Sequence, residues 1–499
     1  MGIRPPTPDG RAVIAIVVSR ADHASEHIGE RLLELADWER RTDETRPDAD
    51  GGGTYYRTEG FELREFDDLH IRLDDPAAAF GEPSTESTRA APDPTFLVFV
   101  SRHSGETGAL LTAHVTGNFG PAEYGGDPDA LARAAPGAEK RVVDALAAHA
   151  PDGYDVGIEC THHGPTDVSV PSLFVEVGSD TQQWEDPEAA RAVARAVLDL
   201  RDTGADLVGS DGRPRHVVGF GGGHYAPRFT RIVRETAWAV GHVGADWGLA
   251  AMGSAAANAD LVDLAFERSR ARHAVIEGTR PELASTVEEL GYRVVSETWV
   301  REVDDRPLAL VETLEERIAP VDDGLRFGDI VPEAPAGVEE WPAEAVVVRE
   351  LPAELLARAQ GIDGAAARAA VEANTVAFDT EQAGTRAVGE GAFDATHVNG
   401  AGRSAPDRRG YADLVADLAA VLDASYDEVR ITDEAVVART ESFDPTLAAE
   451  LGVPEGPAFG RLADGQSVEV DGETVTPDDV SRRTEDRFPI GEAVTVDGE

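Results

Sequence analysis

Histidines and carboxylates gather in four segments that each follow or end an expected strand. The segments are SRHSGETG, AHVTGNFG, ECTHHGPTDVSVP and GFGGGHYAPRF. Their polar residues with catalytic or ligating potential are His103, His114, Asn118, Glu159, His162, His163 and His224. In an α/β protein the ends of strands are where ligands and catalytic groups are presented. The pattern therefore predicts that these side chains meet at one sheet edge, although they lie far apart in the sequence.

Imidazoles and carboxylates brought together would suit a metal-bound or histidine-activated water, so hydrolysis is the reaction class that the pattern favours. A single histidine at a strand end is typical of a structural residue, but four such loops in one domain indicate function. Glu176 and Asp180 flank a VGS turn, where they could serve as metal ligands, as partners of the ligands, or as turn and helix caps. Cys160 is interpreted as a small buried residue. The sequence holds no GxSxG elbow and no HExxH helix.

Three glycines, Gly221, Gly222 and Gly223, come directly before His224. Glycine lets the backbone approach a ligand closely, and the run precedes an expected helix N-terminus. It lacks the Lys-Ser/Thr ending of a phosphate-binding loop. The run alone therefore does not define the ligand.

The elements that must position these residues alternate between strands and helices. Apolar, β-branched runs predict strands over 12–18, 95–103, 109–119, 154–160, 171–179 and 216–220. Helical spacing of apolar residues, with Asp186 as a cap and Pro187 at the first position, predicts helices over 25–40, 137–150, 187–201 and 228–240. This alternation favours a three-layer α/β/α sandwich with a mostly parallel or mixed sheet.

The composition along the chain indicates two domains. Residues 1–320 hold 12 of the 13 histidines and are expected to form the catalytic domain, with an acidic, solvated insertion or hairpin over 41–94. Residues 321–343 are rich in acid, Gly and Pro, which is typical of a linker. Residues 344–499 are expected to form a smaller α+β extension.

The charge of the chain is strongly unbalanced. Acidic residues number 94 against 45 basic ones, the formal net charge is -49, and Lys140 is the only lysine among 499 residues. A hydrophobic content of 41% is too high for a disordered acidic chain, so the charge coats a folded body, as in proteins of extreme halophiles. At molar salt counterion release contributes little, so this charge does not exclude an RNA ligand. The single cysteine excludes a disulfide framework, and the short apolar run near the N-terminus predicts a strand and a cytoplasmic protein.

Taken together, the motifs resemble a known family. HVTGNFG, ECTHHGPTDVSVPSLFVEVGS with the following Trp184, and GFGGGHYAPRFT with GHV at 241–243 are similar to the archaeal and plant type of D-aminoacyl-tRNA deacylase, over roughly residues 10–320. The resemblance implies hydrolysis of the ester that joins a D-amino acid to the 3′-terminal ribose of tRNA. It also implies a zinc cofactor and a fold related to nucleoside phosphorylases and peptidyl-tRNA hydrolases.

The resemblance also implies roles for single residues. The expected catalytic residues are Glu159, His162, His163 and His224. The expected substrate-binding residues are His103, Asn118, Gly221, Gly222 and Gly223, with the glycine backbone receiving the terminal adenosine or the developing oxyanion. The expected metal ligands are His114, His162, His163, Glu176, His224 and His242.

Two alternatives stay open at the level of the sequence. One is a zinc-dependent hydrolase or phosphorylase that acts on a nucleoside or a small amide, because a fold does not fix a substrate. The other is a non-catalytic RNA-binding protein. For the deacylase we expect tRNA charged with a D-amino acid as the partner, and no DNA, membrane or obligate protein partner.

Overall fold

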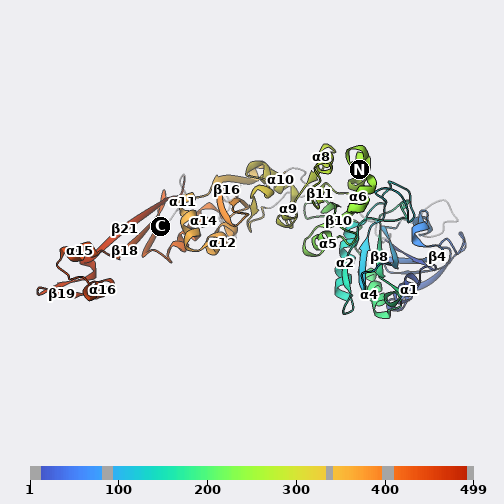
Figure 1. Cartoon of the computed structure of the whole chain (residues 1–499), viewed down its shortest axis with the longest axis horizontal. Helices are drawn as coiled ribbons and strands as arrows, with labels where there is room; N and C mark the ends of the chain where they lie inside the picture. Colours follow the sequence, from blue (N-terminus) through green and yellow to red (C-terminus); the bar gives the residue numbers. More distant parts are fainter. Residues whose placement is uncertain (1–12, 81–93, 333–340, 396–409, 492–499) are drawn as a thin grey trace. The chain divides into compact units, whose positions relative to one another are not determined.

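The computed structural model describes residues 13–80, 94–332, 341–395 and 410–491. The chain divides into two compact units, the first ending at Asp305 and the second beginning at Arg306 (Figure 1). The expected boundary at residue 320 lies inside the second unit. Of the expected linker, residues 321–332 include a short strand of that unit, and residues 333–340 lie outside the described residues.

The first unit alternates strands and helices, as the apolar periodicity predicts. Its elements are β1 (Ile14–Ser19), α1 (His23–Leu35), β2 (Glu39–Asp43), β3 (Gly53–Thr58), β4 (Phe61–Phe66), β5 (Phe96–Arg102), β6 (Leu110–His114), α2 (Pro136–His149), β7 (Asp155–Ile158), β8 (Ser172–Gly178), α3 (Thr181–Trp184), α4 (Pro187–Leu198), β9 (His216–Phe220), α5 (Pro227–Glu235), β10 (Ala239–Gly244), α6 (Asp246–Met252), α7 (Ala259–Ser269), β11 (His273–Ile276), α8 (Pro281–Glu289), β12 (Arg293–Val294) and α9 (Glu297–Glu302).

Eight strands form one mixed sheet in the order β2-β3-β4-β1-β5-β8-β6-β7. The central strands β4, β1, β5 and β8 run parallel, whereas β6 runs antiparallel to β8 and parallel to β7. Central parallel strands are covered on both faces, which is why β1 and β5 are continuous apolar runs. The expected α/β class, with a mixed sheet and flanking helices, is confirmed.

The two faces of this sheet are covered differently. Helices α1, α2 and α4 pack on one face, with α1 against β1 and β5, α2 against β6 and α4 against β8. On the other face alternate residues of the same strands, among them Val17, Phe99 and Phe174, pack against short 3-10 turns and loops that contribute Ala77, Ala79, Ala132, Val168 and Val170. The polar side chains discussed below lie on this loop-covered face.

A second sheet of the first unit has the order β10-β9-β11-β12 and is parallel throughout. Val218 and Phe220 pack toward α7, while Gly219 lies against Phe229 of α5. Helices therefore cover both faces of this smaller sheet. The strands that the sequence analysis assigned to one sheet are divided between two.

A solvated insertion or a hairpin was expected over 41–94, and the described residues there include a hairpin that belongs to the main sheet. This hairpin is β3–β4, and β4 pairs in parallel with β1. Glu62 and Arg64 of β4 are fully buried because each neutralises the other, with Arg64 Nε donating to Glu62 Oε1 at 2.7 Å. The LHIRL segment that follows forms a 3-10 turn at His70–Arg72. Residues 81–93 lie outside the described residues.

The second unit combines helices with antiparallel sheets. Its elements are α10 (Leu308–Arg317), β13 (Arg326–Phe327), β14 (Val346–Glu350), α11 (Ala353–Ile362), α12 (Gly364–Asn374), β15 (Ala377–Glu381), β16 (Arg386–Asp394), α14 (Tyr411–Leu422), β17 (Glu428–Ile431), β18 (Ala435–Phe443), α15 (Pro445–Glu450), α16 (Pro457–Ala463), β19 (Val468–Val470), β20 (Glu473–Val475) and β21 (Ser481–Pro489). Helices α11, α12 and α14 share one apolar core with strands β15, β16, β18 and β21. Over the described ranges of both units, no helix has the length and apolar character needed to span a membrane.

Candidate active site

The strand register places the first group of polar side chains on one face of the eight-stranded sheet. Glu176 of β8 lies opposite Ser101 of β5 on one side and Thr112 of β6 on the other. Side chains two residues apart on a strand share a face. His103 and His114, two residues beyond Ser101 and Thr112, are therefore carried to the same face as Glu176. This part of the cluster forms on the antiparallel pair β8–β6, on the face of the sheet, and not along a row of strand ends.

The loop after β7 supplies the second group. Glu159 and Cys160 are buried, and His162 and His163 follow them with part of each ring accessible. His163 has a φ of 45°, in the left-handed region that a non-glycine residue rarely adopts. Gly164 follows it because a Cβ there would meet Gly126 N at 2.3 Å. Strained backbone held in this way is typical of functional loops.

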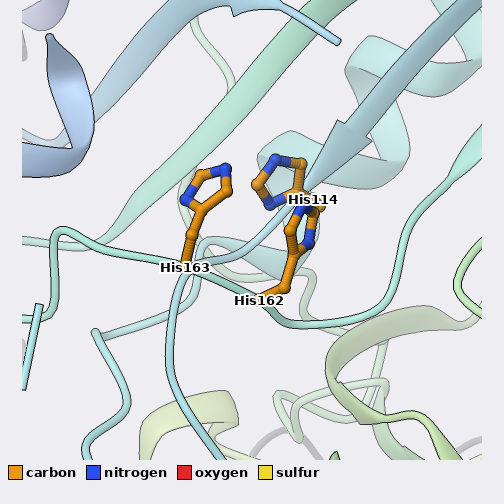
Figure 2. Close-up of side chains that lie close together, drawn as sticks. All are labelled: His114, His162 and His163. Carbon is orange, nitrogen blue, oxygen red and sulfur yellow. The ribbon is translucent and has the colours of Figure 1, made fainter. Parts of the chain in front are cut away.

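Three imidazoles converge into a histidine triad, which we define as His114, His162 and His163 (Figure 2). The ring centroids lie 4.3 Å apart for His114–His162, 4.9 Å for His114–His163 and 4.4 Å for His162–His163. One side-chain nitrogen from each residue lies within 4.8 Å of the other two. The expected meeting of these three histidines is therefore found.

Each ring of the triad is oriented by a main-chain carbonyl. His114 Nδ1 donates to Val115 O at 3.3 Å. His162 Nδ1 donates to Cys160 O at 2.8 Å, and His163 Nδ1 donates to Gly164 O at 2.6 Å. Because a carbonyl only accepts hydrogen bonds, Nδ1 carries the proton and Nε2 carries the lone pair when the ring is neutral. Metal-binding histidines are usually oriented in this manner.

Burial and nearby charges set the protonation of the triad. Burial lowers the pKa of His162 well below its ordinary value and lowers the pKa of His163 to about 4. Burial also opposes protonation of His114, but the Glu176 carboxylate outweighs it and raises the pKa of His114. His162 and His163 are therefore neutral near pH 7, with Nε2 available as an acceptor.

Glu159 lies between the triad, where its Oε2 is 3.7 Å from His162 Nε2, and two further histidines, His103 and His224. Its Oε2 accepts from His224 Nε2 at 2.7 Å, and its Oε1 lies 3.1 Å from His103 Nδ1. Thr112 donates to Oε1 as well, and Tyr225 Oη lies 3.1 Å from His103 Nε2. The hydrogen bond to a carboxylate puts the His224 proton on Nε2, so Nδ1 of His224 carries the lone pair.

The ionisation of His103 and the ionisation of the nearby carboxylates depend on each other. Burial opposes ionisation of His103, yet the carboxylates of Glu159 and Glu176 raise its pKa to about 11. Burial likewise opposes ionisation of Glu159, but hydrogen bonds from His103 and His224 hold its pKa well below the ordinary value. His103 is thus an imidazolium that neutralises buried carboxylates, which makes its role electrostatic.

Cys160 lies beside His224. Its Sγ is 3.7 Å from His224 Nδ1, and the side chain is fully buried. Burial raises the pKa of the thiol to about 12, with the Glu159 charge adding to the effect. A thiol that stays protonated is a poor nucleophile, so the interpretation of Cys160 as a small buried residue agrees with the structure. Cys160, His162 and His224 nevertheless form another set of possible metal ligands, with ligand atoms within 4.8 Å of each other.

The cluster opens into a pocket of about 370 Å³, which we call the histidine pocket. It is lined by Asn118, Phe119, Gly120, Pro121, Glu123, Tyr124, His162, His163, His224, Trp247 and Ala251. His162 and His224 are 16% and 31% exposed, so a ligand in the pocket reaches both imidazoles. The volume lies within the range of roughly 300–1,000 Å³ of small-ligand sites.

His242 does not join the cluster, and its expected role as a metal ligand is wrong. It is fully buried in β10, with Nδ1 at 3.1 Å from Thr161 Oγ1 and Nε2 donating to Ala132 O at 2.9 Å. Both ring nitrogens are thus occupied. Burial lowers the pKa of His242 to about 4, so a neutral ring holds the loop that carries His162. Asp180, similarly, caps α3 in a capping box and is not a ligand.

Of the expected substrate-binding residues, some line the histidine pocket and others have their hydrogen-bonding groups occupied. Asn118 lines the histidine pocket, but its amide donates to the carbonyls of Gly125 and Asp127 and so shapes the loop. The amides of Gly221 and Gly222 donate to Gly244 O and to Asp246 Oδ1. Occupied N–H groups cannot hold an oxyanion, so these two amides do not serve as its donors. Contact of Gly221, Gly222 or Gly223 with the terminal adenosine stays a prediction.

Sequence reasoning missed Thr112, Tyr225, Tyr124 and Trp247. Thr112 precedes His114 by two residues, so strand alternation would have placed it on the same face. Tyr225 lies within the GFGGGHYAPRF segment itself. Tyr124 and Trp247 carry no local signal, because only the folded chain brings their loops to the pocket.

Comparison with known proteins identifies the family of this chain. The family model for D-aminoacyl-tRNA deacylase matches residues 90–295, which include the cluster. A D-aminoacyl-tRNA deacylase of Halorubrum lacusprofundi is 68% identical over 494 residues, covering 96% of this chain and 97% of that protein. One from Natronomonas pharaonis is 52% identical over 476 residues, covering 95% of this chain and all of that protein. The similarity therefore extends into the second unit.

A crystal structure of a conserved protein of unknown function is also similar, with 29% sequence identity and a TM-score of 0.49. It covers 58% of this chain and 97% of the other. The resemblance drawn from the sequence motifs is confirmed by the family model and the relatives. They do not favour the nucleoside or amide hydrolase, or the non-catalytic RNA-binding protein. The chain belongs to the D-aminoacyl-tRNA deacylase family.

Proposed function

We propose that this chain hydrolyses the ester bond between a D-amino acid and the 3′-terminal ribose of tRNA, and that the reaction takes place in the histidine pocket. Family membership supports the reaction. One observation carries the location: imidazoles and carboxylates from four separate segments converge beneath a single pocket.

His224 is the group best placed to move a proton. Glu159 holds its Nε2–H at 2.7 Å, and Nδ1, which lies 3.7 Å from Cys160 Sγ, carries the lone pair of a ring that lines the pocket. Water attacks the ester carbonyl carbon while Nδ1 accepts its proton. The bond from that carbon to the ribose oxygen then breaks, and Nδ1 returns the proton to the ribose oxygen. Free tRNA and a D-amino acid are the products.

We also propose that the histidine triad is the site of a zinc ion. His114 Nε2 is buried and has no hydrogen-bond partner among the described residues, although a Glu176 oxygen lies 3.6 Å away. Nε2 of His162 and His163 carries a lone pair, and Nε2 of His114 gains one when that ring loses its proton, so the three nitrogens form a donor set that suits zinc. The ion would supply positive charge beside the ester carbonyl.

Deacylation of D-tyrosyl-tRNA and L-tyrosyl-tRNA in high salt tests the reaction. The D-ester should be hydrolysed faster than the L-ester, and His224→Ala should lower kcat by about 10²- to 10⁴-fold because the base is lost. His149→Ala is the matched control, since His149 pairs with Asp199 away from the pocket. Decay of both esters at the rate without enzyme would reject the reaction, whereas full activity of His224→Ala would reject only the base.

Zinc content gives a separate test of the triad. The purified protein should carry stoichiometric zinc, and His163→Ala should lower the bound zinc because one of three ligands is gone. Elemental analysis after dialysis against a chelator measures this without reference to activity, with His149→Ala as the control. Protein that is fully active and free of zinc would contradict the assignment.

A further inference from the structure

Two exposed aromatic side chains line the histidine pocket. Among the described residues, six large hydrophobic side chains are strongly exposed, and the aromatic ones in that group are Tyr124, at 68%, and Trp247, at 53%. Both belong to the pocket lining, together with His162, His163 and His224. Exposed aromatic residues that gather at a pocket mark a binding surface rather than chance exposure.

Hydrogen bonds hold the backbone at both aromatic residues close to the loops that carry the histidines. Asp246, directly before Trp247, donates its N–H to Gly222 O at 2.9 Å, and its carboxylate accepts from Gly222 N at 2.7 Å. This pair of hydrogen bonds ties the start of α6 to the loop that carries His224. The carbonyl of Tyr124 accepts from Gly164 N at 3.1 Å, next to His163. Each aromatic residue is therefore attached to a loop that carries a histidine of the site.

The pocket offers little to a phosphate. None of its lining residues is Arg or Lys, and Glu123 adds a carboxylate. The net charge of -49 also repels a polyanion, and a salt concentration that screens this repulsion weakens attraction to phosphate equally. Stacking of a nucleobase on an aromatic ring does not depend on charge and persists in salt.

We propose that Tyr124 and Trp247 hold the 3′-terminal nucleobase of the tRNA by stacking and so place the ester beside His162 and His224. This rests on the proposed function and assigns the terminal base, instead of the phosphate backbone, as the recognised part of the tRNA end. The Gly221 and Gly222 amides, which are occupied, are not needed for it. Single-stranded RNA ends are commonly bound in this way.

Kinetics of Trp247→Ala on D-tyrosyl-tRNA test the proposal. Loss of the ring should raise KM by about 10- to 100-fold and leave kcat within about threefold, because stacking binds the substrate without taking part in the reaction. Trp247→Phe should recover most of the affinity, and Tyr124→Ala should raise KM in the same direction. Val208→Ala is the matched control, an exposed hydrophobic residue (54%) outside the pocket. The melting temperature of each variant shows whether it folds.

Inhibition identifies the part of the nucleotide that is bound. Adenosine 5′-monophosphate should inhibit the wild type competitively, ribose 5-phosphate should inhibit far less, and Trp247→Ala should lose this difference. Equal inhibition by the two compounds, or an unchanged KM in a folded Trp247→Ala variant, would overturn the stacking proposal. A loss in kcat alone would overturn it as well. The proposed function fails separately, if the wild type does not hydrolyse D-tyrosyl-tRNA at all.

Discussion

Glu159 is the residue on which the site depends. It accepts hydrogen bonds from Thr112 and His224, and its charge stabilises the His103 imidazolium. Glu159→Gln keeps the size of the side chain but removes the charge. We expect kcat for D-tyrosyl-tRNA to fall about 10²- to 10⁴-fold, because the His224 base is no longer oriented and its protonated form is no longer stabilised. Steady-state kinetics should show KM changed by only a few-fold.

Glu139 supplies the matched control for that substitution. It is a buried carboxyl on α2, and burial alone raises its pKa well above the ordinary value. Glutamine there replaces one neutral group by another, so kcat should stay at the wild-type value. A Glu159→Gln enzyme as fast as Glu139→Gln would remove Glu159 from the reaction.

Residue types and motifs were enough to find most of the cluster, but not to tell which histidines could be ligands and which are structural. His114, His162, His163 and His224 come together as the motifs indicate. His242 has the same residue type in a matching motif, yet its two nitrogens are occupied by Thr161 and Ala132. Hydrogen-bond partners decide whether a histidine is a ligand, and the sequence does not name partners that lie 81 and 110 residues away.

At the scale of elements, capping residues and Pro predicted where helices begin, because those starts depend on neighbouring residues in the sequence. Helix α4 begins where Asp186 accepts hydrogen bonds from the amides of Glu188 and Ala189, with Pro187 at its first turn. The segment of the β3–β4 hairpin is different, because its polar composition suggested either a solvated insertion or a hairpin and did not predict burial. Arg64 and its carboxylate partners neutralise each other inside the sheet, and that pairing is a property of the fold.

The stability of this hairpin tests the buried network directly. Arg64 lies between Glu62 and Asp43, at 2.7 and 2.8 Å, and all three are buried. Arg64→Leu removes the buried cation, but Arg57 still pairs with Glu62 at 2.7 Å and Arg46 lies 3.8 Å from Asp43. The free energy of unfolding should therefore fall by about 3 kcal/mol, the low end for a broken buried pair. Glu39→Ala, which removes an exposed partner of Arg41 on β2, should leave the denaturation midpoint unchanged. Equal midpoints for the two variants would mean that Arg64 is solvated.

Helices α5 and α9 are joined by Glu297, which makes their contact sensitive to pH. Hydrogen bonds from Arg231, and then from Arg301, hold the pKa of Glu297 at about 2. The ordinary value is about 4.3, so this contribution to stability is fully present above roughly pH 5 and is lost as the pH falls toward 2. The free energy of unfolding of the wild type minus that of Glu297→Gln should therefore shrink between about pH 6 and pH 3.5 at constant salt. A difference that stays constant over this range would show that the pair does not titrate.

For the whole molecule, composition was informative about the surface but not about the division of the chain. The Gly- and Pro-rich stretch after Pro320 suggested a linker, whereas the compact units meet at Asp305 and Arg306. Residues 308–317 form helix α10 of the second unit. Which unit a helix packs with depends on long-range contacts, and a change in composition marks a loop without saying what it separates.

The net charge of -49 leads to a prediction for the molecule as a whole. Carboxylates repel one another over a Debye length of about 10 Å at 0.1 M salt, but over only about 3 Å at 1 M. Folding brings these charges together, so the melting temperature should rise steeply between about 0.2 M and 3 M potassium chloride. Circular dichroism measures it, and a parallel series in sucrose, which favours burial without screening charge, should give a smaller rise. A melting temperature that does not change with salt would show that repulsion between carboxylates does not limit the stability of the fold.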